Sequence, residues 1–83
     1  MQVEALNEAV KVRADFQGGK IRPLLIRRGD RVYKVKRVNG AWEDLEGRHK
    51  IYWFSVTVDS SDVFRVCLKT GEMLWWIDSV VMP

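Results

Sequence analysis

Apolar and polar residues alternate along several short stretches of this chain, and this alternation constrains its fold more than any other feature. In KIYWFSVTVD (residues 50–59), the even positions from 52 to 58 are apolar, whereas positions 53, 55 and 57 hold Trp, Ser and Thr. Successive side chains of a β-strand point to opposite faces. The pattern therefore predicts a strand with one buried face, and residues 9–16 and 63–69 repeat it.

Short polar or glycine-rich segments separate these stretches. QGGK, RRGDR, DSSD and KTGE are typical of tight turns, and Asn39–Gly40 is also a turn signal. Five or six short strands joined by such turns predict an antiparallel meander. The fold class is therefore all-β, and we expect the meander to close into a small SH3-like barrel, which limits exposed strand edges. Residues 1–83 are expected to form a single β-barrel domain.

Two positions disturb the regular strand pattern. Pro23 has no N–H to donate to a ladder, so the second strand is expected to begin after it or to lie at an edge. In VYKVKRV, Val38 falls out of phase with Tyr33. A bulge near Lys36 and Arg37 would restore the phase.

The N-terminal residues 2–9 fit the alternation least well. Val3, Leu6 and Val10 recur at helical spacing, although one short turn of helix is marginal by itself. We expect a short helical or irregular segment that covers one end of the barrel.

The last predicted strand carries two adjacent tryptophans, Trp75 and Trp76. Trp76 shares its face with Asp78, whose carboxylate is costly to bury unpaired. We therefore expect Trp75 in the core and Trp76 outside, unless a bulge between Leu74 and Asp78 reverses the assignment. Trp53 is expected outside by the same reasoning, because Ser and Thr share its face.

Positive charge is concentrated in the first half of the chain. The whole sequence has a net charge of +3, whereas residues 11–38 hold ten basic residues and two acidic ones, or +8. Such asymmetry is typical of proteins that bind an anionic partner.

The sequence offers no convincing catalytic, metal or cofactor site. One cysteine and one histidine cannot supply a tetrahedral metal site. Cys67 lies in the middle of a predicted strand, His49 lies in a polar loop, and Ser60 and Ser61 belong to a turn in which their hydroxyls are expected to bond the local backbone. Nucleotide cofactors lack a glycine-rich loop before a helix. We therefore predict a protein that is not an enzyme and binds no cofactor.

The chain carries no sequence signal for secretion or membrane insertion. Its N-terminus lacks the basic and apolar regions of a signal peptide, and no apolar run approaches the roughly 20 residues of a membrane span. A single cysteine also excludes an internal disulfide. The expected location is cytoplasmic, without a membrane partner.

Residues 23–80 resemble a small bacterial domain of uncharacterised activity that occurs alone or beside Y-family (lesion-bypass) DNA polymerase-like proteins. The matching segments are RRGDRVYKVKRV followed by Trp42, then IYWFSVTV, then VFRVCLKTGEMLWWIDSVV. Met73 stands where the family pattern often has Trp. The resemblance implies a compact β-barrel and a link to DNA transactions, and it assigns no functional residue.

These observations favour a small non-enzymatic module that binds nucleic acid or accompanies a DNA-repair or other DNA-transaction protein. Phosphates would contact the basic side chains, and bases would stack on outward indoles. One alternative is a protein-interaction or scaffolding module, including a homodimer. Another is that Lys and Arg only solvate outward faces and protect strand edges, while the indoles pack under the N-terminal segment. The candidate nucleic-acid-binding residues are Lys11, Arg13, Arg27, Arg28, Arg31, Lys34, Lys36, Arg37, Trp53 and Trp76.

Overall fold

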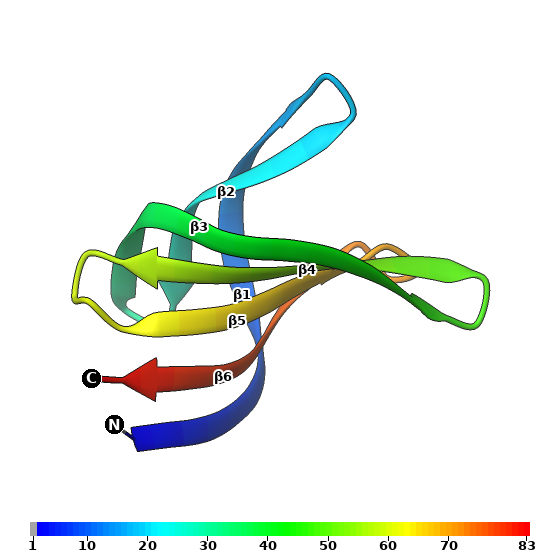
Figure 1. Ribbon diagram of the computed structural model, residues 1–83. Coiled ribbons are helices and arrows are strands. Elements are labelled where there is room, and N and C mark those ends of the chain that lie inside the picture. The colour runs from blue at the N-terminus through cyan, green and yellow to red at the C-terminus, as the bar shows by residue number, and fades with distance from the viewer. Residues whose placement is uncertain (1) are drawn as a thin grey trace.

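The computed structural model describes residues 2–83 as six antiparallel strands without a helix (Figure 1). Each strand pairs with the next, and the last strand pairs with the first, so the hydrogen bonds run in a closed ring. The predicted all-β antiparallel meander is therefore confirmed. The strands are β1 (Gln2–Gln17), β2 (Lys20–Arg28), β3 (Arg31–Glu46), β4 (His49–Val58), β5 (Val63–Lys69) and β6 (Leu74–Met82).

The alternating apolar side chains meet inside this ring. Phe64 is 2% exposed and meets Tyr33 edge-on, with ring centroids 4.9 Å apart. Trp75 packs against the same cluster, with its ring 5.9 Å from that of Phe54. The buried cluster consists of Val10, Ile26, Tyr33, Phe54, Val56, Val58, Phe64, Val66, Ile77 and Val80.

The N-terminal segment differs from its predicted form. Residues 2–9 are extended and pair with β6, so the expected helix does not form. The register shifts between Ala5 and Glu8, and Asn7 has a positive φ of 49°. The apparent helical spacing of Val3, Leu6 and Val10 thus spans an irregularity between two extended pieces. Pairing with β6 satisfies backbone groups that a single short turn of helix would leave open.

Pro23 lies within β2, so the prediction that this strand begins after Pro23 is wrong. The edge position expected for Pro23 is confirmed, because Pro23 pairs with Ala14 of β1 and has no partner in β3 among the described residues. The missing N–H therefore costs no ladder hydrogen bond. The predicted bulge in β3 is also confirmed, since the register skips Lys36 between Val35 and Arg37.

Asn39–Gly40 does not form the predicted turn. Both residues lie within β3, where a second register shift separates Val38 from Gly40. The Asn39 side chain accepts a hydrogen bond from Arg37 Nε at 2.8 Å and donates one to Thr57 Oγ1 at 2.9 Å. These side-chain bonds and continued pairing with β4 favour a bulge over a turn.

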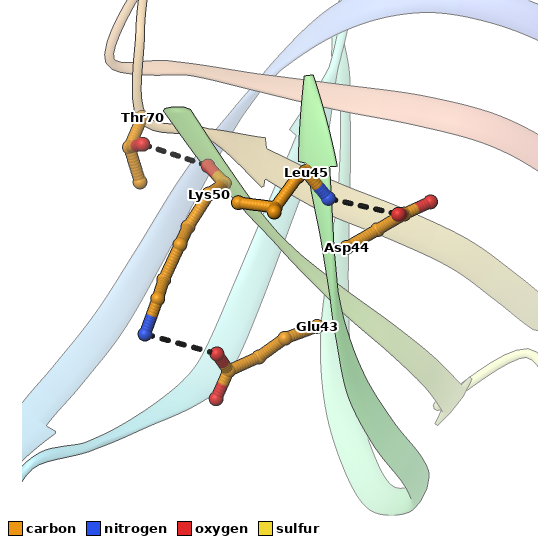
Figure 2. Close-up of polar contacts among 5 residues, drawn as sticks. All are labelled: Glu43, Asp44, Leu45, Lys50 and Thr70. Carbon is orange, nitrogen blue, oxygen red and sulfur yellow. Dashed lines mark hydrogen bonds and ion pairs between the residues drawn. The ribbon is translucent and has the colours of Figure 1, made fainter. Parts of the chain in front are cut away.

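Two hairpins extend beyond the ring in different directions (Figure 1). One joins β1 to β2 through Gly18–Gly19, and the other joins β3 to β4 through Gly47–Arg48. Lys50 stabilises the second hairpin through two contacts (Figure 2). Its Nζ lies 3.2 Å from Glu43 Oε1, and its backbone carbonyl accepts a 2.7 Å hydrogen bond from Thr70 Oγ1. Thr70 follows β5, so this contact ties the hairpin to the sheet.

Substitution of Gly29 tests the turn between β2 and β3. Gly29 has a φ of +59°, and a Cβ there would have no heavy atom within 4 Å. The cost of Gly29→Ala is therefore conformational only, and we expect the free energy of unfolding to fall by about 1–2 kcal/mol.

Gly40→Ala is the matched control for this turn. Gly40 has equally open surroundings but no positive φ. Urea denaturation should show a change below about 0.5 kcal/mol for Gly40→Ala. Equal losses in the two variants would contradict the left-handed turn at Gly29.

Candidate nucleic-acid interface

Three indoles lie along one row on the outer face of the sheet. Trp42 of β3 is directly opposite Trp53 of β4, which is opposite Cys67 of β5, which is opposite Trp76 of β6. Directly opposite residues share a face, and their neighbours Phe54 and Ile77 point into the core. Trp53 and Trp76 are therefore outward as predicted. The rings of Trp42 and Trp53 are nearly parallel, at 5°, with centroids 6.0 Å apart.

Two cations of β5 lie over this row. The guanidinium carbon of Arg65 is 5.1 Å from the ring centroid of Trp42 and 5.3 Å from that of Trp53. Lys69 Nζ is 4.8 Å from the Trp76 centroid. All three distances fall within the range of cation–π attraction. The indoles and the two cations form one surface, which we call the indole row: Trp42, Trp53, Trp76, Arg65 and Lys69.

A basic pair adjoins the end of the indole row. Trp76 is opposite Ala9 of β1, and Lys11, two positions further along β1, is opposite Arg27 of β2. Lys11 and Arg27 line a surface hollow of about 400 Å³ together with Ala9 and Leu74. The outer surface is thus continuous from the indoles to these two charges.

Arg13 and Lys34 extend the basic surface across β1, β2 and β3. Both are opposite Leu25, one from each side, so the three residues form an outward row next to the Lys11–Arg27 pair. Arg13 and Lys34 are exposed. The structure therefore gathers four of the predicted basic residues on one wall.

Two arginines at the β2–β3 turn have other partners. Arg28 donates through Nε to Glu8 Oε1, and this hydrogen bond raises the pKa of Arg28. Its charge is therefore already paired. The guanidinium carbon of Arg31 lies 5.4 Å from the ring centroid of Tyr33. Neither arginine belongs to the row that contains Lys11 and Arg27.

Lys36 and Arg37 lie apart from the Lys11–Arg27 pair, on the part of β3 that pairs with β4. Lys36 occupies the bulge and is exposed, and Arg37 is opposite Thr57. Arg37 Nε donates a hydrogen bond to Asn39 Oδ1, so this guanidinium has a local partner. The predicted basic residues are thus only partly brought together.

Sequence reasoning missed three members of the indole row: Trp42, Arg65 and Lys69. The alternation placed Arg65 and Lys69 outside, but it could not show which indoles they would meet. Trp42 could not be assigned to a strand face, because a turn was predicted at Asn39–Gly40. In the structure, β3 continues through these two residues and includes Trp42. The missing information was cross-strand register, which the two bulges of β3 determine.

Cys67 lies between Trp53 and Trp76 and is fully buried, although its strand position is outward. The two larger side chains on the neighbouring strands explain its burial. Burial raises the pKa of the thiol to about 11. A thiol with a raised pKa is a poor nucleophile at neutral pH, so its place in the row is that of a small packing residue.

The other polar residues considered from the sequence lie at strand ends and turns. Ser60 Oγ donates to the Asp62 side chain at Oδ2, 2.8 Å away, rather than to the local backbone as expected. His49 is exposed at the start of β4, and its side chain lies against Gly71, where an added Cβ would be 2.8 Å from His49 Cδ2. Within residues 2–83, no three His, Cys, Asp or Glu side chains are grouped so as to hold a metal ion.

The fold and this surface define a small all-β domain with an outward aromatic and basic face. Comparison of the chain with protein families, curated proteins and solved structures gave no match. In the described part of the chain, no helix is long and apolar enough to span a membrane.

Proposed function

We propose that this protein is a small non-enzymatic module that binds single-stranded nucleic acid over the indole row. The supporting observation is the alignment of three outward indoles with Arg65 and Lys69, next to the Lys11–Arg27 pair. Bases stack on aromatic side chains with little regard to sequence, while cations bind the phosphates. Trp42 is 38% exposed, so part of its side chain is accessible to a base.

The wider setting of the proposal is a cytoplasmic accessory to DNA repair or another DNA transaction. The resemblance to a domain found beside Y-family polymerase-like proteins supports it, as does the net charge of +8 over residues 11–38. We further propose that the closed ring of strands is an SH3-like barrel. In this proposal the ring is the rigid support that keeps the three indoles in line.

A fluorescence-anisotropy titration tests the proposal. The probe is a labelled oligothymidine of about 15 nucleotides, compared with a duplex of similar length. We expect tighter binding to the single strand and weaker binding when the salt rises from about 50 to about 200 mM. Trp42→Ala and Trp76→Ala should each weaken binding about 5- to 150-fold, because stacking contributes about 1–3 kcal/mol per base.

Leu45→Ala is the matched control, because Leu45 is 64% exposed and lies outside the indole row. Its affinity should equal that of the unsubstituted protein. Absence of binding to either oligonucleotide at low salt would refute the proposal. Equal affinity for single strand and duplex, with no effect of Trp42→Ala, would mean that the surface binds nucleic acid through its positive charge alone.

A further inference from the structure

The sheet splits between β2 and β3. These strands pair only from Leu25 to Arg28 and from Arg31 to Lys34. Beyond that point, within residues 2–83, residues 20–23 pair only with β1, and residues 35–46, apart from the bulged Lys36 and Asn39, pair only with β4. The split leaves two strand edges without a neighbour, and Figure 1 shows the two hairpins diverging from it.

An apolar cleft of about 780 Å³ lies between the diverging hairpins. Phe16 is 63% exposed and Met73 is 72% exposed, although both line this cleft. Uncovered apolar side chains in one concavity are typical of a binding site. The main apolar residues that line the cleft are Phe16, Ile21, Tyr52, Phe54, Leu68 and Met73, and Trp42 and Trp53 of the indole row border it on the β3–β4 hairpin.

Of the two edges, only that of β3 is suited to pair with another strand. The β2 edge contains Pro23, which has no N–H. In β3, residues 40–46 pair with β4 without a register shift, so this edge is regular. Strands with such free edges accept an added strand through backbone hydrogen bonds.

The direction of the free backbone groups follows from the hairpin. Glu46 and His49 flank a two-residue turn and form its hydrogen-bonded pair, so alternate residues from Leu45 backward direct N–H and C=O away from β4. In agreement, the Leu45 N–H is not used by β4 and donates to Asp44 Oδ1 at 2.8 Å (Figure 2). The groups directed toward another strand are those of Ala41, Glu43 and Leu45, and the Leu45 N–H would exchange its bond to Asp44 for one to the added strand.

The charges beside this edge indicate the chemistry of the occupant. Asp44 and Glu46 are exposed on the outer face, and neither forms an ion pair among residues 2–83. The cleft on the opposite face is lined mainly by apolar side chains, and Glu43 at its border is paired with Lys50. An added strand would therefore be complementary if it placed apolar side chains toward the cleft and Lys or Arg on the outer face.

A second copy of this chain fits the edge poorly. If two β3 edges paired about Glu43, the two Glu43 carboxylates would be directly opposite each other, which destabilises a sheet. We propose that the β3 edge and the cleft bind an extended segment of another protein in which apolar residues alternate with Lys or Arg. This strand addition uses the free edge of β3, whereas nucleic acid is proposed to bind the outer indole row.

Amide hydrogen exchange with a synthetic peptide tests the proposal. The probe is acetyl-KVKVKVK-amide, and exchange is followed by NMR on the full chain. We expect the peptide to slow exchange at Ala41, Glu43 and Leu45 at least about tenfold. Trp42 and Asp44 serve as internal controls, because their amides are directed toward β4 and should change little.

Two control peptides separate strand addition from charge attraction. The block peptide acetyl-KKKKVVV-amide has the same composition, and a version of the probe N-methylated at its valines lacks the donors that would face β3. Neither should protect the three amides. Phe16→Ala should weaken binding of the alternating peptide about tenfold, because the cleft loses a large apolar contact.

Three results would overturn the proposal. The first is unchanged exchange at the three amides at saturating peptide, and the second is equal protection by the block peptide. The third is slowing of the same amides as the protein concentration rises without peptide, because this would identify the occupant as a second copy. Oligonucleotide binding by the same preparation is a separate measurement, so failure of one proposal leaves the other testable.

Discussion

Replacing Phe64 with alanine is expected to lower the free energy of unfolding by about 3–5 kcal/mol. Phe64 is 2% exposed, and its ring meets that of Tyr33 edge-on at 4.9 Å. The substitution removes a large buried ring and leaves a cavity inside the closed ring of strands. Because small domains are stable by only about 5–15 kcal/mol, the variant should lose much of its stability. Urea unfolding followed by circular dichroism measures the effect.

Phe16→Ala is the control for this substitution. Phe16 has the same chemistry but is 63% exposed on the β1–β2 hairpin. Its replacement should change the free energy of unfolding by less than about 0.5 kcal/mol. Similar losses in the two variants would mean that the described core does not supply the stability.

The second large effect concerns the thiol of Cys67. Alkylation by iodoacetamide near pH 8 should be at least about a hundredfold slower in the native protein than in the urea-unfolded protein, because only the thiolate reacts. Burial raises the pKa of Cys67 from 9.0 to about 11, which alone reduces the thiolate about a hundredfold. Mass spectrometry of the alkylated chain gives both rates. Rapid modification without unfolding would contradict the packing between Trp53 and Trp76.

The same shift in pKa predicts how stability depends on pH. Above pH 9.0 the Cys67 thiol loses its proton in the unfolded protein, whereas in the folded protein it keeps its proton up to about pH 11. The unfolded state is therefore favoured progressively across this window, and stability falls. Cys67→Ala removes this titration, so any stability advantage of the unsubstituted protein over Cys67→Ala should shrink between pH 9 and 11. A constant difference across the window would contradict the raised pKa.

The candidate site was predictable in its parts but not in its arrangement. Alternation predicted that Trp53 and Trp76 face outward, and the bulge at Asp78 follows Trp76, so it does not reverse this face. Charge counting found ten basic residues between positions 11 and 38, but it could not show that Arg28 is paired with Glu8. Whether a charge is free depends on side chains that are distant in the sequence.

The sequence by itself determined the strands from residue 50 onward, the faces of their side chains as far as Ile77, the glycine turns at positions 18–19 and 29, and the bulge near Lys36. These features arise from local conformational preferences of backbone and side chain, which depend on residues that are neighbours in the sequence.

Tertiary structure alone decided the extension of the N-terminal strand, the bulge at Asn39, the alignment of three indoles and the split between β2 and β3. Each of these depends on which residue lies opposite which across neighbouring strands. Pairing between distant segments, ring closure and bulges set that register, and no local pattern specifies them.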